Sequence, residues 1–457
     1  MRRDTGCRSF LEDLQRFGIK LGLENIAAVL SSFDHPERSF PSVLVAGTNG
    51  KGSVCAMLAE ILTRSGLRVG LYTSPHLVRV EERIRVAGRL ISEGDFCRLA
   101  GSVKRRTDRL LAERKLRACP TYFEVVTALA FLHFRERDVD IAVLEVGLGG
   151  RFDATNVVTP LVSVITNISR DHQAHLGRTI GEIAFEKAGI IKPGVPVICG
   201  PSSGCARRII RRRAREERSP CLDVFGGGCA LSSSKRGGRT VFRYRLDGKT
   251  FVYSPELRGE HQGRNAAVAI AAASTLSRIW RPLPKRTIIE GIEHARWEGR
   301  LEVVSRKPLI LLDGAHNEAG ASSLQKYVRG FLAEPPVVIF GIMKDKSIRR
   351  VAGLLFPYAA KVILTSIPLE RAAEPAEVLA LVPAFKSKII LEPSLKKAFA
   401  IAFSEAGRRG TILITGSLFL VGEAKKLLPR LRRSGLTPSL FTTSSRFSSF
   451  NVSTFER

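Results

Sequence analysis

The sequence lacks the features of a secreted or membrane-spanning protein. Its first residues, MRRDTGCRSFLEDLQRFG, are basic but contain no continuous apolar stretch like that of a signal peptide. No later run approaches the ~20 uncharged residues that a membrane-spanning helix needs. The eight cysteines are scattered and include no Cys-x-x-Cys pair, which favours reduced thiols over zinc sites or disulfides. We therefore expect a cytoplasmic protein.

Acidic residues are also scarce, because 43 Asp and Glu stand against 72 Lys and Arg and leave a formal net charge of +29. The basic excess is spread along the chain, apart from residues 207–218, where Arg207, Arg211 and Arg215 fall on one helical face. No aromatic residues interleave with these arginines, and no nucleic-acid-binding module is recognisable. We interpret the segment as a solvated basic helix, and the net charge as an attraction for anionic substrates. Specific nucleic-acid binding stays as the less favoured alternative.

The length of 457 residues and the 44% hydrophobic content suit two to four globular domains. Apolar runs alternate with helical patterns through the first half of the chain. Strands are expected over residues 43–46, 68–74, 140–148 and 161–168, and helices over 8–30, 54–66, 92–111 and 121–137. This alternation predicts a mostly parallel α/β sheet, in which ligands gather at the carboxyl ends of the strands.

The stretch VLVAGTNGKGS, residues 43–53, predicts a strand, a glycine loop and a helix start that together cradle phosphate. The predicted nucleotide-binding residues of this loop are Gly47, Thr48, Asn49, Gly50, Lys51, Gly52 and Ser53. Lys51 would reach the terminal phosphates and Ser53 would meet Mg²⁺. The standard loop has Ser or Thr directly after the lysine, whereas Gly52 intervenes here. A glycine-rich turn with a solvated lysine is therefore the alternative.

Polar residues follow three of the predicted strands. Ser74 follows one strand, Glu145 lies near the end of another, and Asp171-His172 come after the third. Separately they could be a turn residue, a satisfied core carboxylate and a loop histidine. Together, at the edge that carries the phosphate loop, they predict a divalent cation site. A histidine ligand is unusual for Mg²⁺, so Mn²⁺ is the alternative ion.

The second half of the chain predicts a peripheral hairpin and a second α/β domain. Residues 240–254 alternate around Asp247-Gly248 like a β-hairpin. Residues 261–279 return to a helix, and two prolines near residue 283 precede the domain boundary. We expect a first domain over 1–283, a linker over 284–297 and a second domain over 298–430. The Ser/Thr-rich residues 431–457 are expected to be a disordered tail.

The motifs of the chain, taken in order, resemble a known family. They are VAGTNGKGS (45–53), TSPHLVRVEERIRVAG (73–88), EVGLGGRFDATNVV (145–158), TNISRDHQAHLG (166–177), AFEKAGIIKPGVPVI (184–198), HQGRNAAVA (261–269), WEGRLE (297–302), LLDGAHN (311–317), GIMKDK (341–346) and TGSLFLVGE (415–423). Over residues 8–425 the chain resembles the dihydrofolate synthase/folylpolyglutamate synthase family of muramyl-ligase-like ATP-dependent amide ligases. The resemblance implies a P-loop-type, mostly parallel ATPase domain followed by a smaller Rossmann-like α/β domain.

In the first domain, the resemblance implies roles at the metal and pterin sites. Ser53, Ser74, Glu145 and His172 would hold the metal ions. Lys187 matches a lysine that the family carbamylates with CO₂; an ordinary surface lysine is the alternative. Asp153 would bind the aminopyrimidine edge of the pterin. Phe123 would stack on the pterin ring, unless it is a core residue.

The resemblance also implies that both domains contribute to catalysis. Asn265 would lie near the adenine, Arg300 would clamp the γ-phosphate and Asp313 would bind the ribose. His316 would approach the reacting carboxylate or the incoming glutamate, and Ser417 would help to hold that glutamate. Without the resemblance, Arg300, Asp313 and His316 could be a surface arginine, a turn residue and a loop histidine.

The expected reaction is the ATP-dependent ligation of L-glutamate to dihydropteroate, and the further glutamylation of folates, through an acyl phosphate. Lys51, Lys187, Arg300 and His316 are the expected catalytic residues, and ATP and Mg²⁺ the expected cofactors. The partners would be small substrates, with no specific nucleic acid and no membrane, and we expect a monomer. A ligase restricted to one of the two reactions is the nearest alternative, and a nonenzymatic basic protein is the distant one.

Overall fold

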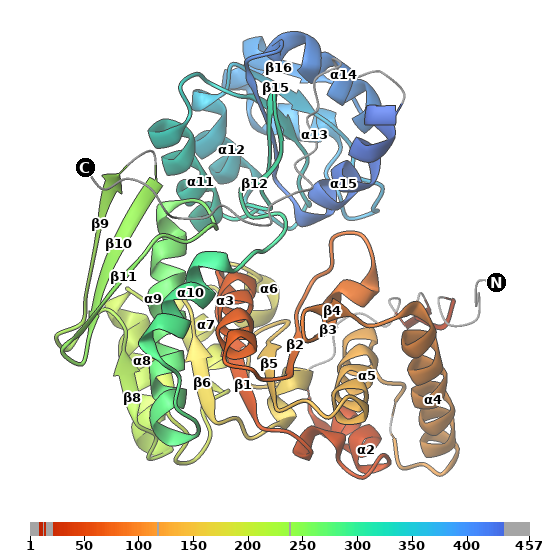
Figure 1. Ribbon diagram of the computed structural model, residues 1–457. Coiled ribbons are helices and arrows are strands. Elements are labelled where there is room, and N and C mark those ends of the chain that lie inside the picture. Colours follow the sequence, from red (N-terminus) through yellow and green to blue (C-terminus); the bar gives the residue numbers. More distant parts are fainter. Residues whose placement is uncertain (1–8, 12, 15–21, 117, 237–238, 434–457) are drawn as a thin grey trace.

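The computed structural model describes residues 9–11, 13–14, 22–116, 118–236 and 239–433, which form two α/β domains in sequence (Figure 1). A small antiparallel sheet, β9 to β11, lies at the side of the first domain. Within these ranges no helix is long and apolar enough to cross a membrane. The predicted α/β class with mostly parallel sheets is confirmed.

The first domain is built on an eight-stranded sheet in the order β4-β3-β2-β5-β1-β6-β7-β8. The strands from β2 to β8 in this order run parallel, and β3 and β4 add an antiparallel edge. Their bounds are β1 Ser42–Ala46, β2 Val69–Tyr72, β3 Ile84–Val86, β4 Arg89–Leu90, β5 Ile141–Glu145, β6 Val162–Ile165, β7 Val197–Cys199 and β8 Cys221–Asp223. Because chain order reverses around β1, ligands are expected at its carboxyl end.

The central strand β1 explains why both faces of this sheet are covered. Leu44 and Ala46 belong to one apolar cluster, whereas the alternate residues Val43 and Val45 belong to another. All five residues of β1 are buried, as in a parallel sheet packed on both faces. The sheet is therefore the middle layer of an α/β/α sandwich, and its loops at the strand ends remain available for chemistry.

Helices of the first domain start largely where the sequence predicts. Ser92 accepts a hydrogen bond from the Asp95 amide at the start of α4, and Thr121 caps α5 in the same way. The bounds are α2 Glu24–Ser31, α3 Lys51–Arg64, α4 Glu93–Ala112, α5 Tyr122–Glu136, α6 Gln173–Leu176, α7 Ile180–Ala188, α8 Gly204–Glu216, α9 Glu260–Ile279 and α10 Lys285–His294. The helix expected over 8–30 is described in part, since 15–21 lie outside the described residues.

The predicted hairpin is present. Strand β10 (Arg239–Leu246) pairs with β11 (Lys249–Tyr253) and with β9 (Ala230–Arg236). Asp247 and Gly248 have φ angles of 49° and 73°, as a two-residue turn between twisted strands requires. Residues 284–297, expected as a linker, include α10, whose Gly291 packs on Ile61 of α3.

The second domain has a six-stranded sheet in the order β12-β13-β17-β14-β15-β16, in which β12 alone runs antiparallel. Its strands are β12 Glu302–Arg306, β13 Leu309–Leu312, β14 Val337–Phe340, β15 Lys361–Leu364, β16 Ile389–Leu391 and β17 Thr411–Thr415. Its helices are α11 Glu318–Phe331, α12 Ile348–Leu355, α13 Pro375–Leu381, α14 Leu395–Ala406 and α15 Leu418–Arg433. Two apolar clusters again cover the two faces. Of the tail expected over 431–457, residues 431–433 belong instead to α15, and residues 434–457 lie outside the described residues.

Candidate active site

The phosphate loop predicted over 47–53 connects β1 to α3, which begins at Lys51. Gly50, the N-cap of α3, has a φ of 82°, and a side chain there would collide with the Asn265 amide. A Cβ on Gly52 would lie 2.6 Å from the indole Nε1 of Trp297. The loop is therefore enclosed by α9, which brings Asn265 beside it, and by the segment that leads to the second domain.

Two lysines converge on this loop. The Lys51 ammonium donates to the carbonyl oxygens of Gly47 and Thr48, at 3.2 and 3.3 Å. Lys187, on α7, donates to the same Gly47 carbonyl at 2.8 Å. Its side chain is buried, so the surface-lysine alternative does not hold. Burial, with the nearby charge of Lys51, lowers the pKa of Lys187 to about 7.

Glu145 ends β5 directly beside β1, in register with Val45. Its carboxylate is buried and accepts one hydrogen bond from the Ser74 amide, at 3.1 Å. Burial raises the pKa of Glu145, and the charge of Lys51 opposes that shift. Such a buried carboxylate is stabilised by a cation, and the Ser53 hydroxyl is buried in the first turn of α3.

These oxygen donors fit Mg²⁺, which proteins commonly hold through one or two carboxylates together with substrate phosphates and waters. His172, in contrast, is exposed and precedes α6 with a φ of 50°. In the part of the chain that the structure describes, no three His, Cys, Asp or Glu side chains gather closely enough to hold a metal ion. The described residues thus provide an open, partial coordination sphere.

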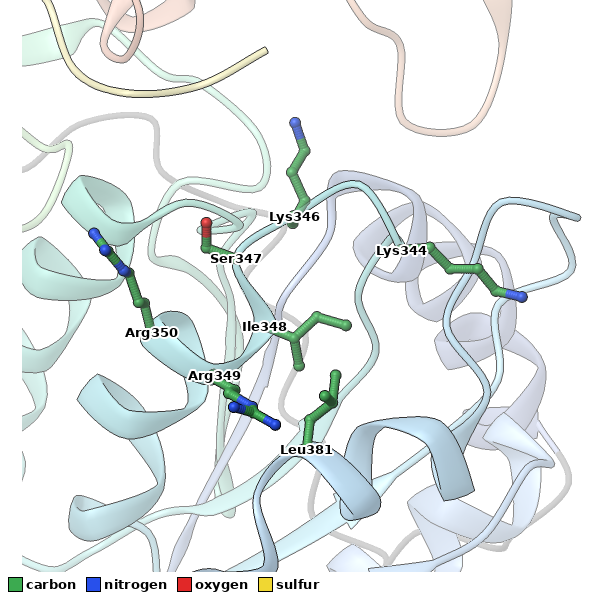
Figure 2. A pocket seen from close by; sticks show the side chains of 7 residues that line it. All are labelled: Lys344, Lys346, Ser347, Ile348, Arg349, Arg350 and Leu381. Carbon is green, nitrogen blue, oxygen red and sulfur yellow. The ribbon is translucent and has the colours of Figure 1, made fainter. Parts of the chain in front are cut away.

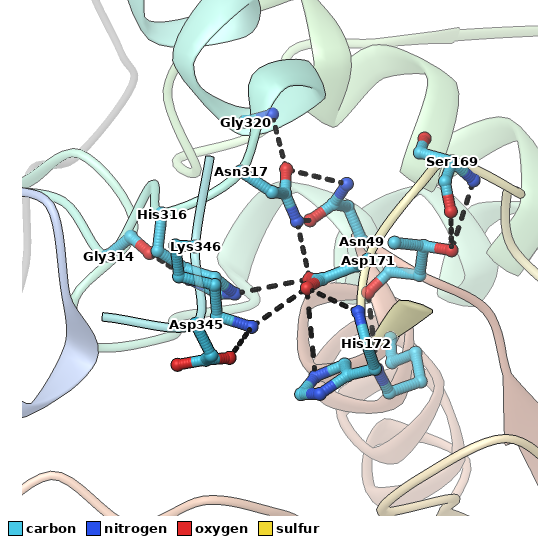
Figure 3. A network of polar contacts seen from close by, with 12 residues as sticks. Asn49, Ser169, Asp171, His172, Gly314, His316, Asn317, Gly320, Asp345 and Lys346 are labelled. Carbon is cyan, nitrogen blue, oxygen red and sulfur yellow. Dashed lines mark hydrogen bonds and ion pairs between the residues drawn. The ribbon is translucent and has the colours of Figure 1, made fainter. Parts of the chain in front are cut away.

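A polar network around Asp171 joins the two domains (Figure 3). One carboxylate oxygen of Asp171 lies 2.8 Å from the Lys346 ammonium, and the other accepts a 2.8 Å hydrogen bond from the Asn317 amide. The Asn317 amide also exchanges hydrogen bonds of 3.0 and 3.3 Å with that of Asn49 in the phosphate loop. His316 approaches Asp171 through Nε2, at 3.4 Å. The network therefore ties the phosphate loop to the start of α11.

The chemistry of this network depends on an ionised Asp171. Burial alone would raise the pKa of its carboxyl group. The hydrogen bond and charge of His316, with the charges of His172 and Lys346, outweigh burial and hold the pKa of Asp171 well below its usual range. Asp171 is thus an anion across the whole physiological pH range, placed between cationic groups of the other domain.

The residues predicted in the second domain also lie at strand ends. Asp313 follows β13, is buried, and accepts hydrogen bonds of 2.9 Å from the amides of Leu301 and Ala315. Burial raises the pKa of Asp313, whereas the charge of Arg300 lowers it. The same guanidinium acts on Glu145 of the first domain. Arg300 therefore lies where it can act between the two domains.

Ser417 is buried at the start of α15, where its hydroxyl accepts a hydrogen bond from the Phe419 amide at 3.1 Å. This contact makes Ser417 a helix cap. The structure gives no contact that places Ser417 in the network around Asp171.

A basic cavity of about 280 Å³ lies beside the network (Figure 2). Lys346 borders it but points away from Ile348 and Leu381, toward the other domain. The lining residues are Lys344, Lys346, Ser347, Ile348, Arg349, Arg350 and Leu381. Glu377 and Glu318 partly neutralise this border, at 3.5 Å from Lys344 and 2.9 Å from Arg350. The surroundings of the network are thus cationic on the side of the second domain.

The predicted pterin residues occupy one loop and one helix start of the first domain. Phe123 is half-buried, and its ring centroid lies 5.9 Å from that of Tyr72. The ring also packs closely on Gly147, where a Cβ would collide with it. The Asp153 carboxylate accepts hydrogen bonds from the Leu148 amide and from the amide and hydroxyl of Thr155. Asp153 therefore holds its own loop in shape.

Asn317 and Lys346, two residues of the interdomain network, carry no specific role in the sequence-based prediction, which places Asp171 only beside His172 on the metal side. Each of these three network residues lies within a motif that marks a strand end, namely TNISRDH, LLDGAHN and GIMKDK. That position was the available signal. The motifs did not show that these residues pair, because Asp171 is 146 positions from Asn317 and 175 positions from Lys346.

Comparison with known proteins defines the class of this two-domain site. The Mur ligase middle domain matches residues 45–273, and the Mur ligase glutamate ligase domain matches residues 299–418. The first match includes the phosphate loop, and the second includes Arg300, Asp313 and His316. The fold and the site are those of a Mur-type ATP-dependent ligase.

Individual relatives narrow this class. The chain is 34% identical over 425 residues to the dihydrofolate synthase/folylpolyglutamate synthase of Bacillus subtilis, covering 92% of this chain and 98% of the relative. The structure of Escherichia coli FolC in complex with DHPP and ADP has a TM-score of 0.83 at 29% identity, with 93% and 98% coverage. The structure of Mycobacterium tuberculosis folylpolyglutamate synthase, complexed with ADP and AMPPCP, has a TM-score of 0.81 at 32% identity and covers 89% of this chain and 95% of its own. The chain belongs to the dihydrofolate synthase/folylpolyglutamate synthase family.

Proposed function

We propose that this protein joins the amino group of L-glutamate to the carboxylate of dihydropteroate, and that it adds further glutamates to folates. The carboxylate oxygen attacks the γ-phosphorus of ATP, and ADP leaves. The glutamate amine then attacks the acyl carbon, the C–N bond forms, the amine loses a proton and inorganic phosphate leaves. The observation that carries the proposal is the contact between the phosphate loop and the start of α11, where Asn49 and Asn317 exchange hydrogen bonds between the two domains.

The phosphate side of the reaction is assigned to both domains. Lys51 and the loop amides bind the β- and γ-phosphates, and Arg300 stabilises charge on the phosphoryl group in transfer. Mg²⁺, held by Ser53, Ser74 and Glu145 with His172 at its open side, would neutralise charge on the phosphates. Support comes from the buried Glu145 carboxylate, which lies close to the charges of both Lys51 and Arg300.

Lys187 is proposed to carry a carbamate. The neutral amine would attack CO₂, forming a C–N bond and releasing one proton, so that a cation becomes an anion. Support comes from burial, from the pKa of about 7, and from the position of Lys187 on the Gly47 carbonyl. An anion there would offset the charge of Lys51 and of a nearby metal ion.

The sites for the pterin-containing acceptor and for the glutamate amine are also assigned to residues of the two domains. Phe123 would stack on the pterin, and Asp153 would bind the aminopyrimidine edge of the pterin. Asp313 would bind the ribose, while His316 and Ser417 would guide the glutamate. The cationic surroundings of Lys346 support a negatively charged substrate here. We further propose a monomeric cytoplasmic enzyme with domains over 1–283 and 298–430.

A phosphate-release assay tests the function. Wild-type protein with ATP, Mg²⁺ and glutamate should release phosphate with dihydropteroate and also with tetrahydrofolate. Release with only one acceptor would establish a ligase restricted to that reaction. No release with either acceptor, from folded protein, would contradict the proposal and leave the nonenzymatic alternative.

The Lys51→Ala variant tests the role of this lysine in the same assay. Removing this cation takes away stabilisation of the phosphoryl group in transfer, so turnover should fall on the order of 10²–10³-fold or more. Circular dichroism should be unchanged, because the hydrogen bonds of the Lys51 ammonium within the described residues go to carbonyls of its own loop. Wild-type turnover by the folded variant would refute the role of Lys51.

A further inference from the structure

A rigid loop of the first domain reaches toward the second. It connects β2 to the 3₁₀ turn Val80–Arg83, and in Figure 1 it rises toward α15. The amides of Leu77, Val78 and Arg79 all donate to the Glu82 carboxylate, at 2.8 to 3.0 Å. At the base of the loop the Thr73 amide donates to the Arg83 carbonyl at 3.0 Å. Its own hydrogen bonds therefore fix the shape of this loop.

The tip of the loop, Leu77, docks into the second domain. Its side chain packs against an apolar cluster of that domain that includes Leu420 and Val421. A Cβ on Gly299 would lie 3.5 Å from both Leu77 methyl carbons. A Cβ on Gly422, in α15, would collide with the Leu77 carbonyl oxygen. The two domains thus meet at backbone distance, which a larger residue at position 422 would prevent.

The segments on both sides of the Leu77 contact lead to residues of the candidate active site. Three residues before Leu77, the Ser74 amide holds the Glu145 carboxylate. On the other side, Gly299 immediately precedes Arg300, and the Gly299 carbonyl accepts a hydrogen bond from the Gly314 amide at 3.0 Å. The second-domain side is fixed as well, because Lys425 of α15 lies 2.6 Å from Glu298.

We propose that Leu77 is a positioning residue that sets the separation between the metal side of the site, Ser74 and Glu145, and Arg300 across the domain interface. The inference rests on the proposed ligase function. Leu77 touches no group assigned to substrate, so it would act through the two segments that it holds together. Small misplacement of reacting groups can cost about 10²-fold in rate, which makes such a joint consequential.

Leu77→Ala should lower kcat by about 10- to 100-fold, while the Kd of the ATP analogue AMPPCP changes less than about threefold. The split is expected because Lys51 and the loop amides, which bind the phosphates in the ground state, lie in the first domain, whereas Arg300 is assigned to the phosphoryl group in transfer. Small-angle scattering of the AMPPCP-bound variant should show a larger radius of gyration than the wild type. If Leu77 were only a structural residue, its replacement would lower the melting temperature without this combination of lower kcat, nearly unchanged Kd and larger radius of gyration.

Gly422→Ala tests the same joint from the other side. Alanine has a higher helix propensity than glycine, so α15 itself should not be weakened, yet the new Cβ must displace Leu77. It should reproduce the kcat and scattering changes of Leu77→Ala. Leu391→Ala, at an exposed edge of the second domain, is the matched control and should leave both unchanged.

Wild-type kcat and wild-type scattering in Leu77→Ala or in Gly422→Ala would overturn the inference, as would loss of AMPPCP binding equal to the loss of kcat. Failure of the ligase proposal is recognised separately, because the wild type would then release no phosphate with either acceptor. The scattering comparison would still decide whether Leu77 sets the domain arrangement.

Discussion

Lys187 and Glu145 owe their chemistry to burial rather than to residue type. A lysine at a helix surface would remain charged, but Lys187 is 4% exposed and lies close to the charge of Lys51. A carboxylate in water would remain ionised, whereas burial raises the pKa of Glu145. Burial therefore destabilises the charged form of each group. Neutralisation, or pairing with an opposite charge, would relieve that cost.

At the residue scale, the fraction of Lys187 that carries a carbamate should rise with pH. Its pKa is lowered to about 7, so the neutral amine that reacts with CO₂ becomes the major form as the pH rises through about 7. NMR with ¹³C-labelled bicarbonate should show a carbamate signal that grows from pH ~6 to pH ~8. The Lys187→Arg variant should lack that signal.

Carbamate in Lys187→Arg, or a signal that falls with rising pH, would contradict the assignment. A linked effect is expected on stability in bicarbonate-free buffer. Between pH ~7 and ~10 the unfolded lysine binds a proton that the folded one has lost, so the free energy of unfolding should rise with pH relative to Lys187→Met.

At the scale of elements, the phosphate loop and the start of α3 are shaped by segments remote in sequence. Asn265 of α9 meets Gly50, and Trp297 meets Gly52, so the loop glycines are needed for close approach as well as for turning. Gly52, which interrupts the standard phosphate-loop pattern, is where the connection to the second domain touches the nucleotide site.

Gly52→Ala should therefore destabilise the protein by about 1–3 kcal/mol and raise the KM for ATP, because the new Cβ displaces the Trp297 ring or the helix start. Chemical denaturation and steady-state kinetics measure the two effects. Gly353→Ala is the matched control, since nothing lies within 4 Å of a Cβ at that exposed position of α12.

The control should be neutral or stabilising by up to about 1 kcal/mol, as helix propensity predicts. Equal stability and equal KM in the two variants would show that Trp297 does not constrain the loop.

At the scale of the whole molecule, the two domains meet through charge as well as through Leu77. Asp171 of the first domain faces His316, Asn317 and Lys346 of the second. An anionic substrate that binds the Lys346 ammonium competes with Asp171 for it. The interface is thus both a structural contact and a part of the proposed amine site, which suits domain closure coupled to binding.

Closure should be visible in solution. Adding AMPPCP and pteroate should reduce the radius of gyration, because both domains contribute residues to one site. Asp171→Asn should enlarge the radius of the free protein and lower kcat, and a double-mutant cycle with Lys346→Met should give a coupling of about 0.5–3 kcal/mol.

Lys344→Met, which removes a neighbouring cation outside the network, is the control for loss of charge alone. Indistinguishable scattering with and without AMPPCP and pteroate would count against closure. A coupling near zero would show that the Asp171–Lys346 pair contributes nothing to the domain contact.

The sequence by itself determined much of the local structure and indicated the candidate site residues. Apolar runs buried on both faces, a Ser92 cap and an Asp247-Gly248 turn are readable within a few residues, because the forces that set them are local. Strand-end positions likewise pointed to Glu145 and Asp313. The strands β3 and β4 escaped prediction because three and two residues carry too little periodicity.

Tertiary structure alone decided how these residues are used. Burial of Lys187, the occupation of Asp153 by its own loop, the central place of Asp171 and the docking of Leu77 on Gly422 all depend on which segments meet. Asp171 and Lys346 are 175 positions apart, and no local pattern records their pairing. The physical reason is that burial, charge pairing and close backbone contact belong to the packed chain, whereas periodicity and capping belong to the segment.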